Sequence, residues 1–283
     1  MKTMIEKIKY ILKGVKEKKY SFMAKFSFTN RLLHNSHWGS MFNFLLKNKS
    51  DSMMVTWSDL IKFEANYPEE YVYTLNKTSY TSNFTEYYDQ KYKDIIIFLN
   101  SINNLNDKLF IELGSGWGRN LIYLNSIFPK LKFIGGDLSS HGIKTTNLFS
   151  KKFDLNISGI PFNYLNHKKF INKISNFESE FIIYSSFSIE QVANLNKEFF
   201  YDLINLNNKI TAFHIEPISF QIEDREFPFN DYYNKHYNKN FYSILKELEN
   251  EKLIKILFIK TYSFGHANNI TGQESCIISW EKI

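Results

Sequence analysis

The chain of 283 residues has very little cysteine and no long hydrophobic run. Its single cysteine, Cys276, excludes an internal disulfide, and a reducing compartment fits this composition. No stretch approaches the roughly 18 consecutive apolar residues of a membrane-spanning helix. The N-terminus also lacks the continuous apolar core of a signal peptide. We therefore expect a cytoplasmic protein without a membrane span.

Excess positive charge is absent outside the first fifty residues. The formal net charge is +6, but residues 1–50 hold eleven Lys and Arg against two Glu, which gives +9 there and leaves −3 for the rest. A nucleic-acid substrate requires a basic track beside the site. The charge distribution therefore does not favour nucleic acid as the substrate, although a contact with RNA through the N-terminal segment stays open.

The basic N-terminal segment, residues 1–19, has the pattern of an amphipathic helix. Lysines fill one face and apolar residues repeat at helical spacing on the other. Such a helix either packs on its own domain with its basic face in solvent, or contacts an anionic membrane surface or a partner. The apolar positions are Met4, Ile5, Ile8, Ile11, Leu12 and Val15.

One stretch, residues 109–120, organises the rest of the chain. Its apolar run ends at Glu112, and glycines follow at positions 114, 116 and 118. This pattern predicts a strand, a tight turn and then a helix that stops before Pro129. Glycine permits positive φ and close approach of a ligand to main-chain N–H groups. Such a turn between strand and helix is where nucleotide-like ligands bind in open α/β sheets.

A second strand follows over residues 131–138 and ends at Asp137. A carboxylate at this point can accept hydrogen bonds from both hydroxyls of a ribose. Glu112 in the turn opposes a diphosphate and suits a ligand with a positive end. The spacing Gly-x-Gly-x-Gly also departs from the dinucleotide pattern Gly-x-Gly-x-x-Gly. An NAD-dependent enzyme is therefore the alternative rather than the leading interpretation.

The pattern Glu112-x-Gly114-x-Gly116-x-Gly118 followed by Asp137 resembles the class I S-adenosylmethionine (SAM)-dependent methyltransferases over residues 80–283. The resemblance implies an α/β fold with a seven-stranded, mostly parallel Rossmann-like sheet, an antiparallel last strand and helices on both faces. We expect a helical, basic N-terminal lobe or lid over residues 1–80 and a methyltransferase domain over residues 81–283. A polar insert at 219–240 is the expected substrate loop.

The resemblance also implies SAM as the cofactor. Asn163, after a third strand, matches the position that bonds the adenine amino group. Tyr88 and, more weakly, Tyr80 are candidates to stack on adenine or face the sulfonium, although tyrosines here also suit packing of the lobe onto the core. The remaining cofactor candidates surround the first two strand ends and are Glu112, Gly114, Ser115, Gly116, Gly118, Asp137 and Leu138.

Three residues at or just after the carboxyl ends of later strands are candidates for catalysis. His214 and Glu216 alternate onto one face of the strand at 209–217, near its carboxyl end. His214 could act as a base that Glu216 orients, and a purely structural pair is the alternative. Glu190, with Gln191, follows the strand at 181–187 and either contacts the substrate or begins a helix.

No metal site is predicted. His34 and His37 are three residues apart, but no third ligand is evident near them. The methyl donor brings its own electrophile, so the implied reaction requires no metal.

We expect an in-line methyl transfer to a small molecule or glycan, with a sugar hydroxyl as the leading acceptor. The slightly acidic domain, the tyrosine-rich lobe and the polar insert motivate this choice. The alternatives are an RNA or protein methyltransferase that docks through its basic N-terminal segment, and a non-catalytic binding protein of the same fold. The sequence does not determine the oligomeric state.

Overall fold

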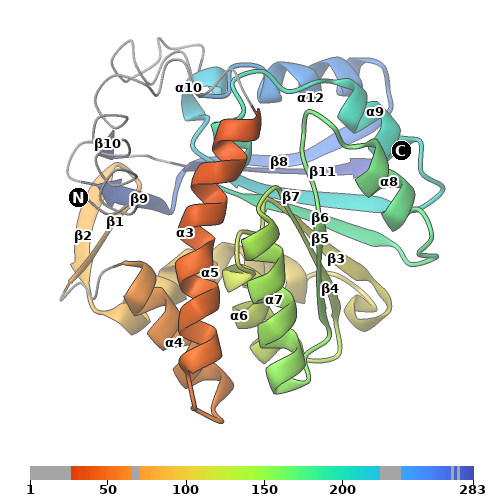
Figure 1. Ribbon diagram of the computed structural model, residues 1–283. Helices are drawn as coiled ribbons and strands as arrows, with labels where there is room; N and C mark the ends of the chain where they lie inside the picture. The colour runs from red at the N-terminus through yellow and green to blue at the C-terminus, as the bar shows by residue number, and fades with distance from the viewer. Residues whose placement is uncertain (1–26, 66–69, 224–236, 269–270, 273–274) are drawn as a thin grey trace, which may run out of the picture.

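The computed structural model describes residues 27–65, 70–223, 237–268, 271–272 and 275–283 (Figure 1). The predicted helix at 1–19 and most of the insert at 219–240 therefore lie outside the described residues. Within them, no helix is both long enough and apolar enough to cross a membrane.

A seven-stranded sheet with the order β5-β4-β3-β6-β7-β11-β8 forms the centre of the molecule. The first five of these strands are parallel and β11 runs antiparallel to both of its neighbours. The predicted fold class is thus confirmed. In chain order, the strands are β3 Leu109–Leu113, β4 Lys132–Asp137, β5 Ile157–Pro161, β6 Phe181–Ser186, β7 Ile210–Glu216, β8 Ile254–Ser263 and β11 Ser275–Lys282.

Helices cover both faces of this sheet, because successive side chains of each buried strand point to opposite sides. In β3, Ile111 joins the core beneath α8, α9 and α12, whereas Phe110 joins the core on the side of α4 to α7. The helices are α3 Ser27–Lys47, α4 Met53–Glu64, α5 Phe84–Asn100, α6 Arg119–Ile127, α7 Ser140–Phe153, α8 Lys168–Ile174, α9 Glu198–Ile204, α10 Ser219–Ile222 and α12 Phe241–Asn250. Two short 3-10 helices are η1 Leu105–Asp107 and η2 Ile189–Gln191.

A second, smaller sheet with the order β10-β9-β1-β2 lies at one end of the molecule (Figure 1). Its strands are β1 Tyr71–Leu75, β2 Thr78–Ser82, β9 Gly265–Asn268 and β10 Thr271–Gly272. Strands β9 and β10 both lie in the part of the chain that connects β8 to β11. The pairing of β9 with β1 joins segments almost 200 residues apart in the chain, which no local pattern reveals.

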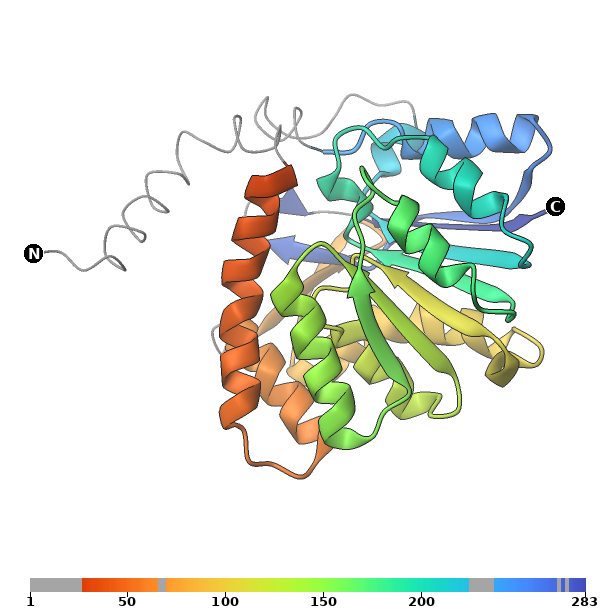
Figure 2. The same cartoon turned by 45° about the vertical axis from the view of Figure 1, so that its right-hand side comes forward.

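Helix α3 lies alongside α7 in both views (Figures 1 and 2). The side-chain oxygen of Asn35 accepts hydrogen bonds from Ser139 Oγ at 2.8 Å, from Ser140 Oγ at 3.2 Å and from the His141 N–H at 3.3 Å. These bonds satisfy groups at the first turn of α7 that the helix itself leaves open. They hold α3 beside the carboxyl end of β4, where the functional site begins.

Candidate cofactor and acceptor site

The glycine turn after β3 has the backbone conformation that its sequence predicts. Gly114 and Gly116 have φ values of +79° and +57°, in the left-handed region. A Cβ at Gly114 would lie 2.4 Å from Ser188 Cβ, and one at Gly116 would lie 3.2 Å from Cζ2 of Trp38. The turn is therefore closely covered by the segment after β6 on one side and by α3 on the other.

Asp137 ties the ends of the first two strands of the sheet together. Its Oδ2 accepts a hydrogen bond from the Gly116 N–H and its Oδ1 accepts one from the Ser139 N–H, both at 2.7 Å. Burial raises the pKa of Asp137 to about 6 even though both bonds favour the carboxylate. Asp137 is thus a hydrogen-bond acceptor placed on the turn that the glycines form.

Two cavities meet over the glycine turn. They share Trp38, Gly114, Gly116 and Gln191, so they form one crevice along the carboxyl ends of the strands. The smaller, of about 130 Å³, is also lined by Asp137, Leu138, Phe162, Asn163, Tyr164, Ser188 and Val192. The larger, of about 380 Å³, is also lined by Glu64, Val72, Tyr87, Ser115, Trp117, Arg119, Asn120, Ser186, Phe187 and Glu190.

Three of the cofactor candidates line neither cavity. Glu112 lies beneath the turn, fully buried, with Oε1 accepting a hydrogen bond from Asn120 Nδ2. Gly118 is the N-cap of α6. Tyr88 packs within the lobe against the ring of Trp57, with centroids 5.2 Å apart. The other six candidates, Gly114, Ser115, Gly116, Asp137, Leu138 and Asn163, line the crevice.

Among the described tyrosines of residues 70–88, Tyr87 lines the crevice, one residue before Tyr88 on α5. Tyr80 lies in β2, 43 % exposed, and stacks on Tyr73. The tyrosine-rich segment thus does reach the site. A run of adjacent aromatic residues on one helix does not say which of them faces the ligand.

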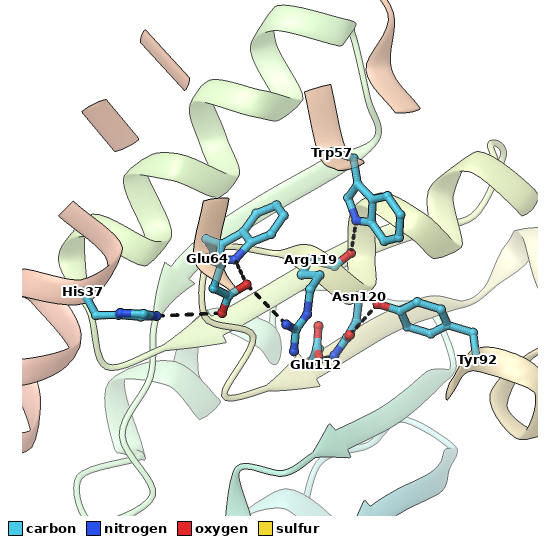
Figure 3. A network of polar contacts seen from close by, with 8 residues as sticks. His37, Trp57, Glu64, Tyr92, Glu112, Arg119 and Asn120 are labelled. Carbon is cyan, nitrogen blue, oxygen red and sulfur yellow. Dashed lines mark hydrogen bonds and ion pairs between the residues drawn. The ribbon is translucent and has the colours of Figure 1, made fainter. Parts of the chain in front are cut away.

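The structure adds an ion-pair network that sequence reasoning missed (Figure 3). Glu64, the last residue of α4, accepts hydrogen bonds from Arg119 Nη1 at 3.2 Å and Trp117 Nε1 at 3.0 Å, and its Oε1 lies 3.8 Å from His37 Nε2. Burial alone would raise the pKa of Glu64, but Arg119, His37 and Trp117 lower it to about 2. Arg119 directly follows the third glycine, so its place beside the motif is visible in the sequence. Its partner Glu64 is 55 residues away, and no local pattern indicates that the two pair.

His214 does not lie in the crevice. Its Nε2 accepts a hydrogen bond from Trp280 Nε1 at 3.0 Å, and its Nδ1 lies 2.8 Å from Ser185 Oγ. Because Nε2 is an acceptor, Nδ1 carries the proton and donates it to the serine. Burial lowers the pKa of His214 to about 3. Both ring nitrogens are engaged within the core, so this structure gives His214 no contact with a substrate proton.

The effect of replacing His214 by leucine tests this placement. The variant leaves the Trp280 N–H and Ser185 Oγ without their buried partner, at about 1–3 kcal/mol for each group. We expect a matching loss in the free energy of unfolding, measured by urea denaturation, with unchanged affinity for the cofactor. Trp280→Phe removes only the donor and serves as the matched control. A folded His214→Leu protein of undiminished stability would contradict the structural assignment.

Glu216 and Glu190 occupy different positions around the segment after β6. Glu216, at the end of β7, is fully buried and accepts hydrogen bonds from the N–H groups of Ser188, Ile189 and Glu190. Glu190 lines the larger cavity, and its Oε2 is buried without a hydrogen-bond partner among the described residues. Of the three catalytic candidates, the structure brings only Glu190 to the crevice.

No group of three or more His, Cys, Asp or Glu suited to a metal ion occurs among the residues that the structure describes. The His34 side chain lies outside them. His37 is exposed and has Glu64 as its ion-pair partner.

No protein-family model matches the chain, and no curated protein does. Among solved structures, it is similar to magnesium protoporphyrin IX methyltransferase from Synechocystis PCC 6803 with bound S-adenosylhomocysteine (SAH), at 12 % identity and TM-score 0.45 over 71 % of this chain and 88 % of that one. A SAM-dependent methyltransferase from Aquifex aeolicus matches at 10 % identity and TM-score 0.45, over 71 % and 94 %. Geranyl diphosphate C-methyltransferase from Streptomyces coelicolor A3(2) matches at 11 % and 0.46, over 68 % and 78 %.

At such low identity these likenesses concern the fold and not the activity. The evidence for the fold is the strand order of the central sheet itself. Its strand order, with five parallel strands followed by an antiparallel β11 inserted before β8, agrees with the sheet that the sequence resemblance implies. The chain therefore has the Rossmann-like α/β fold that the sequence resemblance implies.

Proposed function

We propose that the protein is a SAM-dependent methyltransferase that methylates a hydroxyl group of a small molecule or a sugar. The observation that carries this proposal is a single crevice with a different chemistry at each end. Asp137 lies at one end, the glycine turn lies where the two cavities meet, and Glu190, with its unpartnered carboxyl oxygen, lies at the other end. The first end suits a ribose and the second suits removal of a proton.

The residues of the smaller cavity fit the adenosine part of SAM. Asp137 supplies carboxylate oxygens for the ribose hydroxyls, and Asn163 supplies an amide for the adenine. Gly114 and Gly116 lack side chains, so Ser188 and Trp38 pack closely against the turn beside this cavity. When bound, SAM supplies an electrophilic methyl group.

Arg119 in the larger cavity is suited to the carboxylate of the methionine part. Its Nη1 bonds Glu64, and a guanidinium has further donors arranged as a fork. Replacing Arg119 by methionine should weaken SAH binding about 10- to 100-fold, the effect of losing a charge-assisted hydrogen bond. Calorimetry with 5′-methylthioadenosine, which lacks that carboxylate, is the control and should show unchanged affinity. Equal losses for both ligands would contradict this role.

Glu190 is the residue suited to act as general base. Burial and the nearby Glu216 raise the pKa of Glu190 to about 8, which is close to the value that best serves proton transfer near neutral pH. The Glu190 carboxylate would take the proton of the acceptor hydroxyl as its oxygen bonds the methyl carbon and the bond from that carbon to the sulfur of SAM breaks. SAH would be the leaving group, and the proton would then pass from Glu190 to solvent. The remaining walls, including Trp38 and Tyr87, orient the acceptor and exclude water.

The lobe contributes to this site directly, which supports its proposed role as a lid. Trp38 from α3, Glu64 from α4 and Val72 from β1 all line the larger cavity. A cavity of about 380 Å³ with walls from both parts suits a small acceptor better than a polymer. We therefore place RNA and protein acceptors second.

A methyl-transfer assay tests the proposal. Purified full-length protein is incubated with SAM labelled on its methyl group and with pools of sugars, small alcohols and phenols, alongside pools of RNA and of protein. Label transferred to a hydroxyl of a small molecule, and absent with Glu190→Gln, supports the proposal. Transfer to RNA or protein alone would overturn the acceptor class.

A further inference from the structure

The carboxylate of Glu216 lies directly behind the turn that carries Glu190. Its Oε1 accepts hydrogen bonds from the N–H groups of Ser188 at 3.3 Å and Ile189 at 3.2 Å. Its Oε2 accepts from Ser188 at 3.1 Å and from the Glu190 N–H at 3.3 Å. One buried side chain therefore satisfies three successive backbone donors at the edge of the crevice.

This turn has an unusual backbone that requires such support. Phe187, the residue between β6 and the turn, has a φ of +52°, which is uncommon for a bulky residue. Strained conformations persist only where the surrounding structure holds them. The N–H of Phe187 donates to the Ile215 carbonyl at 3.1 Å, so β7 supports the turn through its backbone as well as through Glu216. On the far side, the Asn238 N–H donates to the Glu190 carbonyl at 2.9 Å.

The hydrogen bonds of the two carboxyl groups differ sharply. Glu216 has its three backbone donors and a further hydrogen bond from Ser185, and all of them favour its ionised form. Glu190 Oε2 has no partner among the described residues. Burial raises the pKa of both groups, to about 7 for Glu216 and about 8 for Glu190. As pH rises, Glu216 therefore ionises first and Glu190 keeps the proton.

The other titratable groups around Glu216 and Glu190 do not place a negative charge beside Glu190. Behind Glu216, burial raises the pKa of Tyr164 and of Cys276, so both are neutral near pH 7. Across the cavity, Glu64 and Arg119 form an ion pair with each other. Tyr87, also on that wall, is kept neutral by burial. Glu216 is thus the like charge that acts on Glu190 from the described part of the chain.

We propose that Glu216 is a positioning residue that fixes the turn from which Glu190 reaches the crevice and keeps the proton on Glu190 by like-charge repulsion. The inference rests on the proposed role of Glu190 as base. In it, Glu216 positions Glu190, whereas the sequence pattern suggested that Glu216 orients His214. The proton then leaves Glu190 only near its raised pKa, so Glu216 sets the pH at which the site becomes active.

Carboxyl titration by NMR tests the charge relation without any reaction. Full-length protein carries Glu labelled with ¹³C at the side-chain carboxyl, and the Glu190 signal is assigned by its loss in Glu190→Gln. In Glu216→Gln, the Glu190 titration midpoint should fall by about one pH unit or more, the usual effect of removing a like charge. Glu216→Asp retains the charge and is the matched control, with a midpoint that stays high.

A reciprocal measurement guards against misfolding of Glu216→Gln. In Glu190→Gln the midpoint of Glu216 should stay nearly unchanged, because Glu216 ionises while Glu190 is still protonated and neutral. The pH dependence of methyl transfer by Glu216→Gln should move to lower pH by the same amount as the Glu190 midpoint. A Glu190 midpoint that stays high in Glu216→Gln would overturn the inference. Shifted midpoints in a protein that transfers no methyl group would support the coupling and count against the proposed function.

Discussion

Replacing Glu190 by glutamine is expected to lower kcat for methyl transfer by about 100- to 10,000-fold, the usual contribution of a general base. The amide has nearly the same shape, so the cavity wall is preserved, but it cannot accept the acceptor's proton. Affinity for SAH should not change, because Glu190 lies at the acceptor end of the crevice. Single-turnover kinetics with labelled SAM measures the rate, and calorimetry measures the affinity.

The pH dependence of the rate of the unmodified enzyme is a second test of Glu190 as the general base. Only the ionised form of Glu190 can accept a proton, so the rate should rise with pH and level off above about pH 8. This limb should disappear in Glu190→Gln. Glu198→Gln, at an exposed carboxylate of α9, is the matched control and should retain both rate and limb. A Glu190→Gln protein with an unreduced rate would show that the acceptor needs only positioning and no base.

Replacing Asp137 by alanine is expected to weaken SAH binding by about 100- to 10,000-fold. The variant loses a carboxylate able to accept from two ribose hydroxyls, at about 1.5–3 kcal/mol for each charge-assisted bond. It also releases the N–H groups of Gly116 and Ser139, to which Asp137 is bonded at 2.7 Å in this structure. Calorimetry with SAH measures the change.

Two further variants separate these contributions of Asp137. Asp137→Asn retains an acceptor oxygen and should lose less affinity than the alanine variant. Asp154→Asn, at the C-cap of α7, tests a carboxylate away from the crevice and should bind as the unmodified chain does. An Asp137→Ala protein that is folded, by circular dichroism, and binds SAH normally would exclude the ribose role.

The sequence was sufficient wherever the signal was local. Gly114, Gly116, Asp137 and Asn163 are candidates named from short segments, and all four line the crevice. Apolar runs located the central strands because parallel strands are buried on both faces.

The sequence was insufficient where distant segments decide which side of an element faces the site. Alternation correctly placed His214 and Glu216 on one face of β7. It did not reveal that Trp280, on the last strand, would take the His214 Nε2. Nor did it show that Glu216 would hold the turn before Glu190. Both arrangements depend on the packing of strands far apart in the chain.

Isothermal calorimetry of the full-length protein with SAH, beside NAD, tests the central claim most directly. We expect micromolar binding of SAH and no detectable binding of NAD, because Glu112 beneath the turn and the Gly-x-Gly-x-Gly spacing do not suit a diphosphate. Binding of NAD with no binding of SAH would contradict the methyltransferase proposal and make the crevice a dinucleotide site.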